Sequence, residues 1–98
     1  MENISEQFYL SGYTWHYDRI VKTPTHKLRV LIVRNSYDHQ SSLEGQVLGT
    51  EMKWNRLVLR PIQNSNSHQA CYTNKREDIT PFQKDADSIL DEMIAILS

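Results

Sequence analysis

The sequence of 98 residues carries a formal net charge of −1, with 39% hydrophobic and 23% charged residues. This composition is typical of a globular chain rather than a disordered one, and the near-neutral charge gives no overall attraction to nucleic acid or to an anionic membrane. A chain of this length buries roughly two-thirds of the surface that its unfolded form exposes, which is enough for one core without a disulfide or a metal. We therefore expect one domain spanning residues 1–98.

The cysteine count and the apolar runs bear on the compartment. The single cysteine, Cys71, excludes a disulfide within the chain, which favours a reducing environment. The opening stretch MENISEQFYL is acidic and lacks the apolar segment of a signal peptide. The longest purely apolar run, Val30 to Val33, is far too short to cross a membrane. We expect a cytoplasmic protein with no membrane partner.

The first half of the chain reads as strands. Residues 1–12 show no clear period, so we expect a loosely ordered N-terminus. The stretch YTWHYDRIV then alternates at period two, which indicates a strand with one side formed by Tyr13, Trp15, Tyr17 and Arg19. After Pro24, the stretch KLRVLIVR at residues 27–34 has an unbroken apolar centre, which predicts a central strand that is buried on both faces.

Two further strands are predicted before Pro61. Residues 41–49, SSLEGQVLG, form a weaker strand in which Leu43 and Val47 share a face and Gly45 indicates a bulge. In WNRLVLRP, residues 54–61, alternation places Trp54 and two arginines on one face. Short connections favour antiparallel neighbours, so residues 13–61 predict a β-meander. Residues 62–79 show no period and are compatible with a loop or with an edge strand.

A helix is predicted over residues 80–97. Thr80 is a suitable N-cap, Pro81 suits the first helical position, and Gln83 completes a capping box. Apolar residues then recur every three or four positions and form one face that should cover the sheet, with Leu90 and Ile94 buried: Phe82, Ala86, Ile89, Leu90, Met93, Ile94 and Leu97. The predicted fold class is α+β, an antiparallel four- to five-stranded β-meander packed by one C-terminal α-helix.

The stretch RNSYDHQSS, residues 34–42, contains the residue types of a catalytic triad in Asp38, His39 and Ser41. Consecutive strand residues point to opposite faces, so Asp38 and His39 cannot readily pair, and no Gly-x-Ser-x-Gly turn exposes a serine. A polar bend explains the composition. The alternative is a recognition loop that binds a protein partner through Tyr37, Asp38, His39 and Gln40.

Metal and cofactor sites have little support. A metal would require His16, His26, His39, His68 or Cys71 to converge, and the H-x-x-C pair of His68 and Cys71 has no second pair at a zinc-site spacing. Nothing near Cys71 supplies a base or a helix N-terminus that would activate its thiol. We expect no catalytic residue, metal, cofactor or small-molecule substrate.

Nucleic-acid binding has more support. Trp54, Arg56 and Arg60 are predicted to share one strand face, and Trp15, Tyr17 and Arg19 another. Aromatic residues interleaved with arginine suit base stacking with phosphate contacts. The same aromatic residues could instead form the core under the helix, with the arginine stems at its edge. The absence of an RNA-binding fingerprint or a phosphate loop makes a single-stranded nucleic-acid-binding domain the second hypothesis.

The leading hypothesis is a non-catalytic protein-binding module. Five Tyr and two Trp are generous for this length, and Tyr, Trp and Arg dominate interface energetics. An open sheet also offers an edge strand to a protein partner or to a second copy. In size and in lack of motifs, the chain is similar to many small phage or mobile-element proteins that inhibit a host protein by binding it. That similarity is one of type and assigns no residue.

Overall fold

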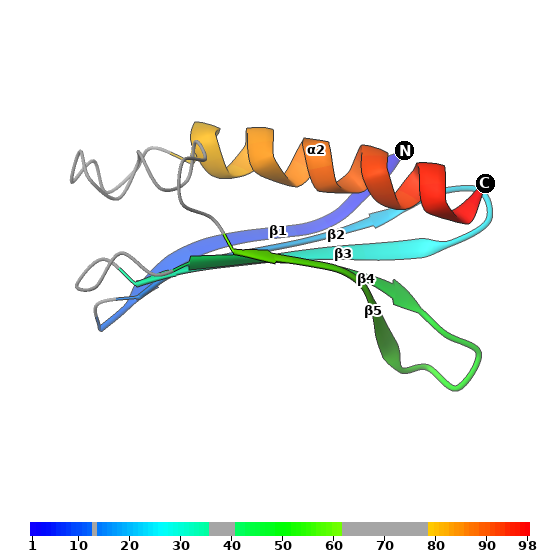
Figure 1. The fold of residues 1–98 in the computed structure, drawn as a ribbon, viewed down its shortest axis with the longest axis horizontal. Helices are drawn as coiled ribbons and strands as arrows, with labels where there is room; N and C mark the ends of the chain where they lie inside the picture. The colour runs from blue at the N-terminus through cyan, green and yellow to red at the C-terminus, as the bar shows by residue number, and fades with distance from the viewer. Residues whose placement is uncertain (13, 36–40, 62–78) are drawn as a thin grey trace.

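The computed structural model describes residues 1–12, 14–35, 41–61 and 79–98. Its strands follow one another across a single sheet in the order β1 (Glu2–Ser11), β2 (Thr14–Lys22), β3 (Lys27–Asn35), β4 (Ser41–Leu48) and β5 (Trp54–Pro61). Every neighbouring pair is antiparallel. The helix α2 (Thr80–Leu97) lies along one side of the sheet (Figure 1). The predicted fold class is confirmed, with five strands.

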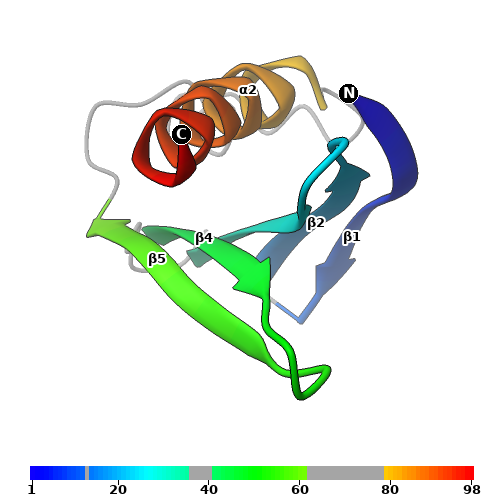
Figure 2. The ribbon, with the colours of Figure 1, turned by 90° about the vertical axis from the view of Figure 1, so that its right-hand side faces the viewer.

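The core lies between α2 and the sheet (Figure 2). The helix contributes Phe82, Ala86, Ile89, Leu90 and Met93, and the strands contribute Tyr17, Val21, Leu28, Val30, Ile32, Leu43 and Val58. The helix approaches β4 closely at Gly45, where a Cβ atom would stand 2.7 Å from Met93 Sδ. Gly45 is also where the register of β4 and β5 shifts, so the bulge predicted there is present, with its extra residue on β5.

The fifth strand comes from the N-terminus. Residues 1–12 were expected to be loosely ordered, but Glu2–Ser11 forms β1 and pairs with β2 along its length. The sequence pattern is weak because β1 is an edge strand whose side toward the helix mixes Glu6 with Phe8 and Leu10. Phe8 packs against Trp15 and Phe82, with ring centroids 5.0 and 4.8 Å apart. These aromatic contacts attach β1 to the core.

The strand β3 is central, as predicted, but only one of its faces is buried. Leu28, Val30 and Ile32 are fully buried under the helix, whereas Val33 on the opposite face is 37% exposed. The prediction of burial on both sides is wrong, because the only helix in the described part of the chain covers one side. The other side of the sheet therefore carries apolar residues that the core does not use.

The helix begins at Thr80, so the capping position is Ile79 and no side chain caps it. The predicted capping box is therefore absent, and the side chain of Gln83 instead donates a hydrogen bond to Glu6 Oε2 at 3.1 Å. Leu90 is fully buried as predicted, but Ile94 is 38% exposed, since it lines an open pocket beside the turn that joins β2 to β3. The question of a loop or an edge strand at residues 62–79 falls outside the described residues, apart from Ile79.

Candidate functional site

The face of the sheet opposite α2 carries aromatic, charged and aliphatic side chains together; we call it the open face. Strand register arranges it in rows that run from β1 to β5. One row contains Tyr9, His16, Val33 and Ser42, and the next contains Gln7, Asp18, Leu31, Glu44 and Leu59. A third row contains Ile20, Arg29, Gln46 and Arg56. No helix of the described residues packs on this face.

An ion pair between β2 and β3 lies at the centre of the open face. Arg29 donates to both carboxylate oxygens of Asp18, at 3.0 Å from Nε and 2.6 Å from Nη2. This hydrogen bonding raises the pKa of the Arg29 guanidinium. The same guanidinium lies 5.7 Å from the ring centroid of Trp54 at the start of β5, within the range of a cation–π contact. Asp18, Arg29 and Trp54 therefore link three strands.

A second ion pair lies beside the first. Arg56 Nε stands 3.2 Å from Glu44 Oε1, and the Gln46 side chain donates to the other carboxylate oxygen of Glu44. Both arginines on the open face are therefore paired with carboxylates, and two acids lie in its middle row. This arrangement leaves the centre of the face close to neutral.

Exposed apolar residues surround these pairs. Tyr9 is 48% exposed and Leu59 is 51% exposed, although both lie on a sheet whose other side is a well-packed core. Tyr9 stacks on His16 with ring centroids 4.9 Å apart and planes 12° apart. The open face thus combines stacked aromatic rings, exposed aliphatic side chains and polar groups that are paired with one another.

The structure divides the predicted set of Trp54, Arg56 and Arg60 between two faces. Gln46 pairs with Arg56 and Gly45 with Val58, so Leu57 is an extra residue on β5. This bulge reverses the alternation: Trp54 and Arg56 lie on the open face, while Arg60 turns to the helix side and pairs with Glu92. The prediction that all three share a face was wrong, because a bulge on β5 cannot be seen from the period of that strand alone.

The second predicted aromatic face lies under the helix. Tyr17 is buried and donates a hydrogen bond of 2.5 Å to Glu6 Oε2. Burial, followed by this bond, raises the pKa of Tyr17, and the same bond is the main cause that lowers the pKa of Glu6. Arg19 reaches Asp87 of α2 at 2.7 Å. Arg19 also donates from Nε to Asn3 Oδ1 at 2.9 Å, so these residues form structural contacts between β1, β2 and α2.

Several predicted site residues lie outside the described part of the chain: Tyr13, Tyr37, Asp38, His39, Gln40, His68 and Cys71. Among the described residues, no group of three or more His, Cys, Asp or Glu side chains is placed to hold a metal ion. His16 stacks on Tyr9, and His26 Nδ1 stands 2.8 Å from the Thr25 hydroxyl. Of the two described histidines, one therefore lies on the open face and the other in the turn between β2 and β3.

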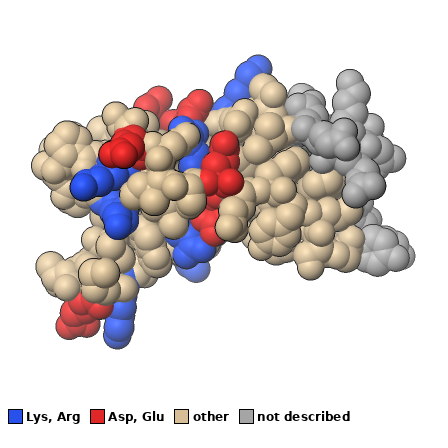
Figure 3. Space-filling view, turned by 180° about the vertical axis from the view of Figure 1, so that it is seen from behind, with Lys and Arg blue, Asp and Glu red and all other residues tan. Residues whose placement is uncertain are grey.

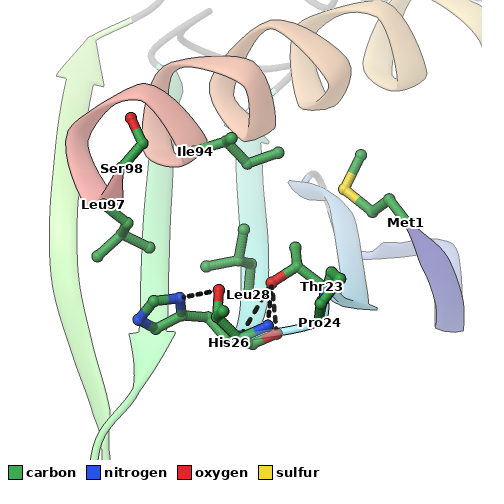
Figure 4. A pocket seen from close by; sticks show the side chains of 9 residues that line it. Met1, Thr23, Pro24, His26, Leu28, Ile94, Leu97 and Ser98 are labelled. Carbon is green, nitrogen blue, oxygen red and sulfur yellow. Dashed lines mark hydrogen bonds between the residues drawn. The ribbon is translucent and has the colours of Figure 1, made fainter.

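A pocket of about 300 Å³ opens between the end of α2 and the turn that joins β2 to β3 (Figure 4). Leu28, Ile94 and Leu97 give it an apolar lining. Its polar rim is satisfied internally, since Thr23 Oγ1 accepts from the backbone N–H of His26 at 2.9 Å and donates to the His26 carbonyl at 3.1 Å. The pocket therefore lacks converging polar groups that would orient a ligand.

No helix in the described ranges is long and apolar enough to traverse a bilayer. Comparisons with protein-family models, curated proteins and solved structures find no match.

Proposed function

We propose that this chain is a non-catalytic protein-binding module that recognises its partner through the open face. The observation that carries the proposal is the exposure of Tyr9, Val33 and Leu59 on a rigid sheet around two internally paired arginines. Interfaces are rich in Tyr, Trp and Arg, and their centres are apolar with few unpaired charges. A face of this composition suits an apolar patch on a folded protein. Inhibition of a host protein, as small phage proteins do, is one activity that such binding supports.

Nucleic-acid binding is the second candidate, and Trp54 beside Arg29 is the observation in its favour. Two features weigh against it. Arg29 and Arg56 are held by Asp18 and Glu44, so phosphates would have to displace these carboxylates. The two acids also lie in the middle row, where they would repel a phosphate backbone.

The test compares two aliphatic residues that are exposed to a similar extent on different surfaces. Leu59 on the open face is 51% exposed and Ile96 on the outer side of α2 is 53% exposed. Affinity capture from the native host should give a protein that wild type and Ile96→Ser retain and Leu59→Ser loses. The captured protein is then purified, and its affinity is measured directly with the three forms. A loss of affinity that is equal in the two variants would place the binding surface elsewhere.

The same variants examine the other hypotheses. Single-stranded and duplex oligonucleotides are titrated at low salt, where phosphate contacts are strongest. Salt-sensitive binding that is lost in Arg56→Ala and kept in Arg60→Ala would favour the nucleic-acid candidate, since only Arg56 lies on the open face. The predicted recognition segment Tyr37–Gln40 connects β3 to β4, and His39→Ala belongs in the capture series as its own test.

A further inference from the structure

The two edges of the sheet are not equally protected. Strands β1 and β5 are the outer strands of the sheet in the described chain, and an outer strand presents unpaired N–H and C=O groups. The β5 edge is interrupted by the extra residue Leu57 and ends in Pro61, both of which hinder further pairing. The irregularity in β1 is confined to its start, between Asn3 and Ser5. From Gln7 to Ser11, β1 is regular and carries no charge.

The uncharged half of β1 also exposes apolar side chains on both faces of the sheet. Tyr9 on the open face is 48% exposed, and Leu10 on the helix side is 41% exposed. Figure 3 views the molecule from behind, and Figure 2 shows that β1 lies on this side. Charged side chains gather over one half of this side, and a wide area of the other half is without charge. An exposed, regular and apolar edge is a template for another strand.

We propose that β1 pairs with β1 of a second copy of this chain, antiparallel, about a two-fold axis that passes beside Tyr9. An antiparallel pair related by a two-fold axis keeps both helices on the same side of the joined sheet. Residues that face the same side must therefore be opposite one another. This register places Tyr9 against its own copy on the open face, and Phe8 against Leu10 of the second copy on the helix side.

The charges of β1 select this register. Pairing centred on Glu6 would set two carboxylates directly opposite each other, which is destabilising. The lowered pKa of Glu6, caused mainly by the Tyr17 hydrogen bond, keeps its carboxylate ionised, so the repulsion could not be relieved at neutral pH. Centring on Tyr9 moves Glu6 to the end of the paired stretch, opposite Gly12. Each exposed apolar residue then meets an apolar residue, as a self-complementary interface requires.

The proposed contact is small, because the regular and uncharged stretch that would pair in each copy is only Gln7–Ser11. Interfaces of this size are weak, so dimerisation should depend on protein concentration in the micromolar range. The joined sheet would carry two open faces side by side, which would raise the avidity for a partner that presents two sites. The dimer does not depend on the proposed function, since it uses the edge of the sheet and needs no third component.

Sedimentation equilibrium of the full chain tests the dimer, and charge exchange tests the register. Tyr9→Lys and Tyr9→Glu should each weaken self-association by at least about tenfold, because like charges face each other across the axis. An equimolar mixture of the two should recover association. Leu59→Lys and Leu59→Glu, at similar exposure on β5, serve as matched controls and should dimerise as wild type. A circular dichroism spectrum and melting curve confirm that each variant is folded.

Cross-linking gives a second readout that does not depend on added charge. In a Cys71→Ser background, Tyr9→Cys should form a disulfide-linked dimer in a glutathione redox buffer, because residues opposite each other in a ladder have close Cβ atoms. Ser5→Cys in the same background should stay monomeric. A wild-type chain that is monomeric at every concentration would overturn the proposal. A dimer that tolerates both Tyr9 charges, or cross-links equally through Ser5→Cys, would overturn the assigned edge and register.

Discussion

The contact between α2 and β4 at Gly45 gives the sharpest stability prediction. In Gly45→Ala, the new Cβ would stand 2.7 Å from Met93 Sδ and 2.9 Å from Ile89 Cγ2. Met93 can move its flexible end, but Ile89 is β-branched and stiff at χ1 in a helix. Overpacking of this kind costs about 1–3 kcal/mol, and the loss of glycine's freedom in the unfolded chain offsets about 0.4–1 kcal/mol.

We therefore expect Gly45→Ala to lower the free energy of unfolding by about 1–2 kcal/mol, which for a domain of this size lowers Tm by roughly 4–16 °C. Urea and thermal unfolding measure both quantities. A double-mutant cycle with Ile89→Ala should show that Gly45→Ala is less costly once the Cγ2 methyl is removed. A neutral or stabilising Gly45→Ala, or a cycle without coupling, would refute the close packing of the helix over β4.

Two further predictions concern the helix and the first strand. Leu90→Ala should lower the free energy of unfolding by about 2–5 kcal/mol, whereas Ile94→Ala, one turn further and 38% exposed, should cost clearly less; equal losses in chemical denaturation would mean that the helix is rotated. For Glu6, the lowered pKa means that its pairing with Tyr17 stabilises the fold above the ordinary Glu pKa of 4.5 and that this stability is lost as pH falls through the lower folded value. The stability difference between wild type and Glu6→Gln should thus be largest at neutral pH and shrink in acid, and a difference that is independent of pH would exclude a role for the ionised carboxylate.

The sheet and the helix were predictable because their apolar residues recur at the spacing of a strand or of a helix. Leu28, Val30 and Ile32 alternate on β3, and Phe82, Ala86, Ile89 and Leu90 recur at helical spacing. The strand β1 was missed because its pairing depends on β2 and on the contact of Phe8 with Phe82. Such contacts are made between distant parts of the chain, and a local pattern cannot show them.

The open face was harder to predict than the core. The period of β5 predicts that Trp54 and Arg56 share a face. The charge balance and the apolar surface of the open face, however, also depend on residues that this prediction did not include. Asp18 and Glu44 neutralise the arginines, and Leu59 supplies exposed apolar surface. The odd positions of β3 offered a signal, since Arg29, Leu31 and Val33 alternate with the core residues. That signal could be read only once the helix was known to cover a single face.

One residue on β5 bears on both functional hypotheses. Without the extra residue Leu57, the alternation of β5 would carry Arg60 onto the open face, where it would join Trp54 and Arg56 in a cationic, aromatic strip suited to a nucleic acid. The register shift between Gly45 and Gln46 instead sends Arg60 to Glu92 of the helix. The open face then keeps only arginines that are already bonded to carboxylates, surrounded by exposed apolar side chains. The centre of this face, where both arginines are held by carboxylates, has more to gain from excluding water against another protein than from contacting phosphates.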